Sequence, residues 1–282
     1  MQPSLLNYRY SLIGAALALL ALGSMPALAE EMDGRQKASR AFWDEHLKPA
    51  NFGDAEIIEG AGQDVLEIKA PFRAEDPTVV PLSIHSKIPQ TAEHYIKKIS
   101  VFIDKNPLPL VGTFEFTPRS GKADLAMRIR VDDFSYIRAI AETNDGKLYM
   151  ADSYIRSLGG CSAPPGESIN ESIARLGEMR VSTIGDLEPG KPSLAQVQIK
   201  HPNITGLALD QRTRVRPPAY FVNKVRVSYE GEPVVTANLT FAISQDPSFR
   251  FFFVPEKGDG ELTVEAVDTK ELAFTETEIV TL

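Results

Sequence analysis

Large apolar residues recur with a period of two along most of the chain, after one short segment with a helical period. Ala38, Phe42 and Trp43 form an apolar stripe that predicts an amphipathic helix over residues 35–47. Over residues 125–132, large apolar side chains occupy every second position, as is typical of a half-buried strand. The chain is therefore expected to consist mainly of β-strands.

Turn residues and a second helical segment divide this pattern. Asn144-Asp145-Gly146 predicts a hairpin turn between two strands. A helical period over residues 167–180 predicts a linker helix, and the glycines and prolines of residues 185–192 predict a break after it. Strand signals resume beyond this break. Since no helix alternates with these strands, a parallel sheet built from β-α-β units is not expected.

We expect an all-β fold of two tandem immunoglobulin-like antiparallel β-sandwiches, with a short N-terminal helix and a linker helix. Residues 1–29 are expected to be a signal peptide, because an apolar stretch precedes the small-x-small cleavage pattern of residues 27–29. The first sandwich is expected over residues 30–182, including the loop of Cys161 and the linker helix. The second is expected over residues 183–282.

The net charge of the chain and its expected export limit the kinds of partner that the protein can have. A net charge of −8 and an isoelectric point near 5.2 argue against nucleic acid or an anionic membrane surface. The apolar stretch before the cleavage pattern is shorter than the roughly 20 residues that a membrane span needs. We therefore expect a soluble periplasmic protein, with no nucleic acid partner and no membrane contact after signal cleavage.

Histidines and glycines give no sign of a metal or cofactor site. None of the four histidines, His46, His85, His94 and His201, stands at a metal-ligand spacing from another. No phosphate-loop pattern accompanies the glycines. We expect no metal and no cofactor, and a Cys–His pair formed in space, with His201 or His85 as base, is left open.

Cys161 is the single cysteine, and it follows Gly159 and Gly160. It cannot form an intramolecular disulfide. The glycines before it and two prolines after it are expected to place the sulfur in an exposed loop, where a mild alkylating reagent would reach it. An unpaired cysteine in an exported protein favours a reactive role. The alternative is a buried structural cysteine, because free cysteine is among the residues most often buried.

No neighbour in the sequence is placed to activate this thiol. Arg156 is the nearest cation, and the expected linker helix begins too far away for its dipole to act. An enzyme would need a base beside the thiol, whereas a carrier can rely on its partner to activate it.

The two halves resemble the two proteins of the SoxYZ sulfur-oxidation carrier, fused in one chain. Gly159-Gly160-Cys161 is similar to the start of the Gly-Gly-Cys-Gly-Gly arm on which SoxY carries sulfur intermediates. Residues 201–207, which begin His-Pro-Asn-Ile-Thr-Gly, resemble the His-Pro-x-x-Thr-Gly segment of SoxZ, and residues 218–222 and 242–247 continue the likeness. Fused chains of this type resemble the SoxYZ-like carriers associated with quinoprotein (PQQ-dependent) dehydrogenases.

The chain departs from the family pattern after the cysteine. Residues 162–165, Ser-Ala-Pro-Pro, replace the trailing glycines, and the chain continues into the second half. Because prolines restrict the backbone, the loop is expected to be stiffer than the family arm and tethered at both ends. This limits its reach into a deep partner site.

The resemblance implies a non-catalytic carrier that holds a sulfur intermediate covalently on Cys161, with Gly159 and Gly160 in the carrier loop. Its partners would be Sox-type sulfur-oxidation enzymes, and the sequence leaves open which group is carried and whether thiosulfate is its source. The alternative is an accessory module for a periplasmic PQQ-dependent dehydrogenase, in which the cysteine is inert. A third hypothesis is a cysteine-dependent enzyme.

Overall fold

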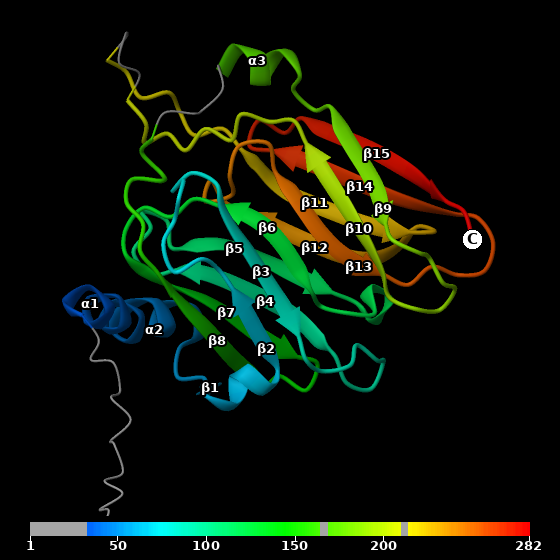
Figure 1. Cartoon of the computed structure of the whole chain (residues 1–282), viewed down its shortest axis with the longest axis horizontal. Coiled ribbons are helices and arrows are strands. Elements are labelled where there is room, and N and C mark those ends of the chain that lie inside the picture. The colour runs from blue at the N-terminus through cyan, green and yellow to red at the C-terminus, as the bar shows by residue number, and fades with distance from the viewer. Residues whose placement is uncertain (1–32, 164–168, 210–213) are drawn as a thin grey trace, which may run out of the picture. The chain divides into compact units, whose positions relative to one another are not determined.

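The computed structural model describes residues 33–163, 169–209 and 214–282, and these residues form mostly β-strands (Figure 1). The expected signal peptide, residues 1–29, and the prolines of the expected stiff loop, Pro164 and Pro165, lie outside the described residues. The helices are α1 (Gly34–Phe42), a π-helical turn (Trp43–Leu47), α2 (Lys48–Phe52), α3 (Ile169–Ala174) and two 3-10 turns (Ala61–Asp64 and Pro118–Ser120). The strands are β1 (Ile57–Ile58), β2 (Leu66–Lys69), β3 (Val80–Ser86), β4 (Ile96–Ile103), β5 (Leu110–Phe116), β6 (Leu125–Ile129), β7 (Ser135–Thr143), β8 (Leu148–Ile155), β9 (Met179–Ile184), β10 (Ser193–Ile199), β11 (Val222–Tyr229), β12 (Glu232–Leu239), β13 (Ser248–Phe253), β14 (Gly260–Asp268) and β15 (Ala273–Val280).

Each of the two sheets contains strands from both halves of the chain, where the first half runs from α1 to β8 and the second from β9 to β15. One sheet has the order β1-β8-β7-β4-β5-β12-β11-β14-β15, and the other has the order β2-β3-β6-β13-β10-β9. The halves join edge to edge, because β5 pairs with β12 in the first sheet and β6 with β13 in the second. The expected boundary between residues 182 and 183 falls within β9.

The two sheets pack face to face around one apolar core. Phe114 of β5 lies 6.4 Å from Phe249 of β13, and Tyr229 of β11 lies 5.3 Å from Phe253 of β13, measured between ring centroids. The same cluster of buried side chains includes residues of both sheets and both halves. The predicted all-β sandwich class is confirmed. The strand period that predicted it is visible in β13, where Phe249, Phe251 and Phe253 are buried.

The predicted N-terminal helix and the predicted hairpin are both confirmed. Asp33 caps α1 by accepting hydrogen bonds from the backbone N–H groups of Arg35 and Gln36, and the Gln36 side chain accepts one from the Asp33 N–H. The turn at residues 144–146 connects β7 and β8, and Gly146 has the positive φ of 83° that such turns require.

The linker helix is shorter than the period over residues 167–180 predicted. Within the described residues, α3 ends at Ala174, and residues 179–184 form β9 instead. Gly177, with a φ of 81°, breaks the helical path, and β9 then pairs along its full length with β10. Pairing with a distant strand overrides the local helical pattern at this point.

The junction between β5 and β12 leaves no room for a side chain at Gly112. A Cβ there would lie 2.7 Å from the backbone oxygen of Asn238. Gly112→Ala is expected to lower the free energy of unfolding by about 1–3 kcal/mol, because the strands must separate to admit the methyl group. Gly34→Ala, whose Cβ would meet nothing within 4 Å, is the control and should not destabilise the fold. Urea unfolding of both variants would measure this, and equal stabilities would contradict it.

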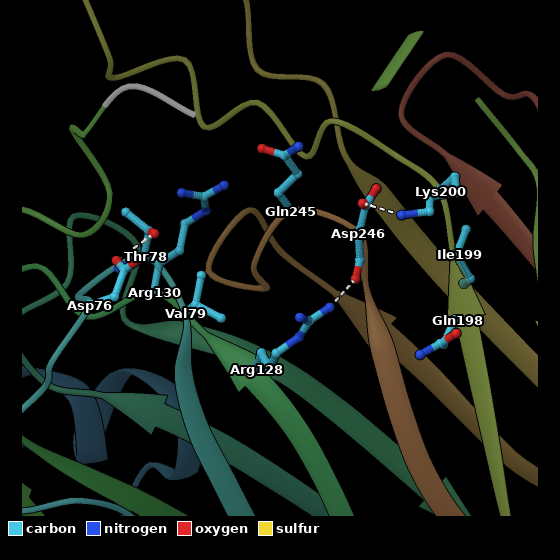
Figure 2. Close-up of a pocket in the computed structure, with 10 residues that line it drawn as sticks. All are labelled: Asp76, Thr78, Val79, Arg128, Arg130, Gln198, Ile199, Lys200, Gln245 and Asp246. Carbon is cyan, nitrogen blue, oxygen red and sulfur yellow. Dashed lines mark hydrogen bonds and ion pairs between the residues drawn. The ribbon is translucent and has the colours of Figure 1, made fainter. Parts of the chain in front are cut away.

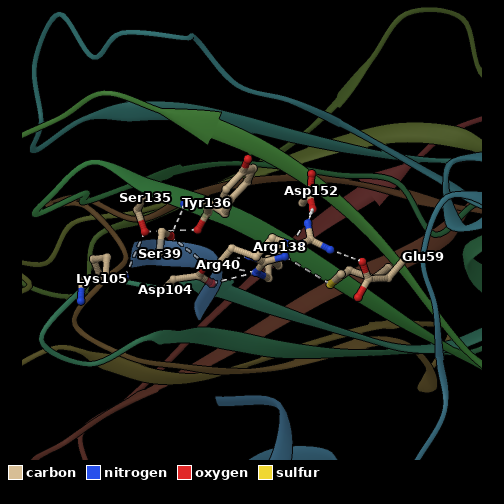
Figure 3. Close-up of polar contacts among 10 residues, drawn as sticks. Ser39, Arg40, Glu59, Asp104, Lys105, Ser135, Tyr136, Arg138 and Asp152 are labelled. Atoms are coloured by element: carbon tan, nitrogen blue, oxygen red, sulfur yellow. Dashed lines mark hydrogen bonds and ion pairs between the residues drawn. The ribbon is translucent and has the colours of Figure 1, made fainter. Parts of the chain in front are cut away.

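A buried polar network fixes α1 to the first sheet (Figure 3). Arg138 of β7 donates from Nε and Nη2 to the carboxylate of Asp104 at 2.9 Å, and both side chains are fully buried. Ser39 of α1 donates to the same carboxylate at 2.8 Å, and the Arg138 guanidinium lies 4.9 Å from the centroid of the Trp43 ring. This charged pair is therefore enclosed by the N-terminal helical segment.

Candidate functional site

The loop that carries Cys161 folds back onto the segment that follows β6. Gly159 N–H donates to the Asp132 carbonyl at 2.7 Å, and Gly160 N–H donates to the Val131 carbonyl at 3.2 Å. Cys161 N–H donates to Asp132 Oδ1 at 2.9 Å. Three consecutive backbone donors are thus held by one short stretch of chain, and the loop is pinned rather than extended into solvent.

Each of the two glycines is required for a different reason. Gly159 has a φ of 78°, a left-handed conformation that other residues rarely adopt. A Cβ at Gly160 would lie 2.1 Å from the Pro77 carbonyl oxygen and 2.5 Å from that of Val131. The glycines therefore let the loop pack tightly against the sandwich.

This packing corrects the expectation of an exposed cysteine. Cys161 is 0% exposed. The small glycines bring the loop close to its surroundings instead of opening it to solvent. Burial, reinforced by the nearby Asp132 carboxylate, raises the pKa of the Cys161 thiol to about 12, and the Arg130 guanidinium opposes this rise. In this conformation the thiol is neutral and shielded.

The second half of the chain supplies the other wall of this site. Thr205 donates from Oγ1 to the Cys161 carbonyl at 2.7 Å, in a buried hydrogen bond. Arg130 of the first half donates to the Asn203 carbonyl at 3.3 Å and to the Gly160 carbonyl at 3.5 Å. The Gly-Gly-Cys segment and the His-Pro-Asn-Ile-Thr segment, 40 or more residues apart, therefore meet at one place.

Residues 201–205 are themselves rigidly held. Asn203, at a positive φ of 39°, accepts from Val222 N–H at Oδ1 and donates from Nδ2 to the carbonyls of Ile243 and Ser244. His201 is fully buried; its Nδ1 accepts from the Asn203 N–H at 3.1 Å. This stretch is a fixed platform for the cysteine loop.

The histidines do not form the Cys–His pair that sequence reasoning left open. Because His201 Nδ1 accepts a hydrogen bond, the proton of the neutral ring is on Nε2, which lies 3.5 Å from Asp268 Oδ2. Burial lowers the pKa of His201, so the ring is neutral. His85 on β3 contacts Asp124 at 3.1 Å. Within the described part of the chain, neither histidine is hydrogen-bonded to Cys161, so the structure pairs neither of them with the thiol.

Sequence reasoning missed three residues that hold the loop: Arg130, Asp132 and Thr205. Asp132 ends the alternating stretch of residues 125–132, where the pattern assigns it no role, yet its side chain accepts the Cys161 N–H. The alternation of residues 125–132 placed Arg130 on the polar face of a half-buried strand, yet it is only 3% exposed. Thr205 lies within the His-Pro-x-x-Thr-Gly stretch, and this motif was the one sequence feature that could have indicated its role.

Comparison with known protein families identifies both halves. Residues 49–161 match the model of the sulfur oxidation protein SoxY, and residues 182–278 match that of the sulphur oxidation protein SoxZ. The chain therefore belongs to the SoxYZ family of sulfur-oxidation carriers, with both domains fused in one polypeptide. The family implies partner enzymes of the sulfur-oxidation system in general. A search of curated protein sequences finds no match.

Solved structures with detectable similarity include three different kinds of protein. The sulfur carrier protein SoxY from Chlorobium limicola f thiosulfatophilum is 28% identical, with 43% of this chain and 100% of that chain covered and a TM-score of 0.34. The superoxide reductase (neelaredoxin) from Ignicoccus hospitalis is 18% identical, with 38% and 98% covered and a TM-score of 0.32. Fibronectin(III)-like modules of Clostridium thermocellum CbhA are 10% identical, with 77% and 94% covered and a TM-score of 0.23. Since all three TM-scores are low, the family assignment rests on the two family models.

None of the helices among the described residues has the length and apolar composition of a membrane span. Nor do three or more histidine, cysteine, aspartate or glutamate side chains of the described residues gather where they could hold a metal ion.

Proposed function

We propose that this protein is an exported, periplasmic carrier that holds a sulfur intermediate covalently on Cys161 and presents it to partner enzymes of sulfur oxidation. Gly159 and Gly160 belong to the carrier loop in this proposal, and thiosulfate is the source of the cargo. The protein performs no chemistry of its own. A partner enzyme activates the thiol, because burial and the Asp132 carboxylate keep it protonated in this conformation.

The observation that supports this proposal most is the meeting of the two family segments. The only cysteine lies at the last residue of the SoxY match, and Thr205, within the SoxZ match, hydrogen-bonds its carbonyl. A purely structural cysteine would not require two glycines, one at a positive φ and one without room for a Cβ, immediately before it.

The buried state of the thiol adds a step to the carrier cycle. A shielded thiol with a raised pKa resists oxidation and alkylation, because the thiolate is the reactive form. Loading therefore requires the loop to leave its place against Val131 and Asp132. The polar contacts that must break are few: the three backbone hydrogen bonds of residues 159–161, that of Thr205 and the weak one of Arg130.

Removing the hydrogen bond of Thr205 should favour this opening. Thr205→Val keeps the shape of the side chain and removes the buried hydrogen bond to the Cys161 carbonyl, worth about 1 kcal/mol, together with the hydrogen bond that Oγ1 accepts from the Leu207 N–H. We expect Cys161 in the folded variant to be alkylated by iodoacetamide about five- to tenfold faster than in the wild type. Thr263→Val, in an exposed position on β14, is the matched control and should leave the rate unchanged. Equal rates in all three proteins would mean that Thr205 does not hold the loop.

The carrier function is tested by intact-protein mass spectrometry of the native protein from its own cells, before and after reduction. A reducible mass increase that maps to Cys161, and that is absent from Cys161→Ser, is the expected result. Its size would identify the cargo. If the protein is isolated with an unmodified thiol, and stays unmodified after incubation with its sulfur-oxidation enzymes and thiosulfate, the carrier proposal is wrong.

A second candidate function is favoured by the burial of the thiol. As an accessory module of a periplasmic PQQ-dependent dehydrogenase, the protein would use its sandwich surfaces, and Cys161 would be an inert core residue. Cys161→Ser should then leave growth on the substrate of the dehydrogenase, and binding to the dehydrogenase, unchanged. Loss of either would exclude this candidate and favour the carrier.

A further inference from the structure

A pocket of about 390 Å³ lies where strands of the two halves meet (Figure 2). Arg128 and Arg130, from β6 and the segment after it, line it from the first half. Lys200, Gln245 and Asp246 line it from the second half. Its volume is within the range of small-molecule sites in proteins. Arg130 connects the pocket with the cysteine loop, because the same guanidinium donates to the Gly160 carbonyl.

The positive charges of this pocket differ in whether a carboxylate neutralises them. Lys200 is paired with the Asp246 carboxylate at 2.7 Å, so these two charges offset each other. Among the described residues, Arg128 donates only to the backbone carbonyl of Asp246, and Arg130 donates only to backbone carbonyls. Neither guanidinium lies within 4.0 Å of a carboxylate oxygen of any described residue. Asp76 at the pocket wall is exposed and is the remaining negative charge.

Arg130 is the unusual member of this set. Arg130 is only 3% exposed, and its Nε–H has no hydrogen-bond partner among the described residues. The Nε–H of Arg128 is likewise buried and without a partner there. Burying a guanidinium without a directly paired anion costs several kcal/mol, and buried charges in proteins are usually paired. The whole chain has a net charge of −8, so the two arginines of this pocket stand out as a local excess of positive charge.

We propose that this pocket binds a small tetrahedral oxyanion, held by Arg130 and Arg128. Guanidinium groups match the oxygens of such anions in geometry as well as charge. Two sources share this chemistry: a free anion such as sulfate or thiosulfate, and the terminal sulfonate of a group attached to Cys161. The second source rests on the proposed carrier function, whereas the first does not.

Sulfate is the probe, and calorimetric titration of the full chain carrying Cys161→Ser is the measurement. Sodium chloride keeps the ionic strength constant, so that general salt effects cancel. We expect saturable binding of one sulfate and at least tenfold weaker binding in the Arg130→Gln variant. Arg226→Gln removes an exposed cation from β11 of the other sheet and should bind sulfate within twofold of the parent. If circular dichroism shows that Arg130→Gln does not fold, Arg128→Gln takes its place.

The absence of saturable binding to the parent would overturn the proposal. So would an unchanged affinity in the folded arginine variants. The titrated chain carries Cys161→Ser and has no thiol. Sulfate binding can therefore be found even if the carrier proposal is wrong, and it can be absent even if Cys161 is found loaded.

A second titration distinguishes the two sources. Tetrathionate loads the wild-type chain: the Cys161 thiolate attacks one central sulfur, the central S–S bond breaks, and thiosulfate leaves with the electron pair, so that Cys161–S–S–SO3⁻ remains. Intact mass confirms the loading. At least tenfold weaker sulfate binding to the loaded chain would identify the attached sulfonate as the occupant. Unchanged binding would identify the pocket as a site for free anions.

Discussion

Replacing Arg138 with leucine is expected to lower the free energy of unfolding by about 3–5 kcal/mol, the largest effect of any single substitution considered for this protein. Arg138 and Asp104 are both fully buried, and three hydrogen bonds of 2.9 to 3.1 Å join them. In the Arg138→Leu variant the Asp104 carboxylate stays buried, with Ser39 as a remaining donor and no cation to neutralise it. Urea unfolding followed by circular dichroism measures the loss.

Two comparisons test this explanation. Arg35→Leu removes an exposed ion pair with Asp133 and should cost no more than about 1 kcal/mol. The double variant Arg138→Leu with Asp104→Leu removes both buried charges and should be more stable than Arg138→Leu alone. If the double variant is the less stable of the two, the loss arises from packing around Trp43 or from Asp152, which loses its ion pair with Arg138 in both variants, and not from the Asp104 carboxylate.

Alkaline pH is expected to destabilise the fold through Cys161. Burial raises the pKa of this thiol from its ordinary 9.0 to about 12, so the folded state keeps a proton that the unfolded state loses above pH 9. The contribution of the neutral thiol is fully present below pH 9 and is lost as the pH rises from 9 towards 12. Between pH 9 and pH 11 the loss is about 2 kcal/mol.

The control for this pH dependence is Cys161→Ser, because serine does not ionise in this range. Its free energy of unfolding should fall less steeply than that of the wild type between pH 9 and pH 11, although buried tyrosines with raised pKa values, such as Tyr220, affect both proteins equally. Parallel curves for the two proteins would mean that the thiol is not buried in solution, and the carrier loop would then be open at rest.

The family resemblance and the secondary structure were both accessible from the sequence. Each depends on residues close together in the chain. The period of β13, the capping residues of α1 and the turn at residues 144–146 are local, and local sterics and solvent exposure decide them. The cysteine behind two glycines was also found in the sequence, together with the second-half segment of residues 201–207. The linker helix was overestimated, because β9 gains its conformation from pairing with β10.

The sequence by itself thus determined the strands, the β-sandwich class, the family and Cys161 as the candidate site. The tertiary structure alone decided that β5 and β12 join the two halves, that Cys161 is buried, and that Arg130 and Thr205 hold its loop. The physical reason is sequence separation. Thr205 is 44 residues from Cys161, and Arg130 is 30 residues from Gly160. Burial and hydrogen bonding across such separations depend on how the sheets pair and pack, which the period of a strand does not encode.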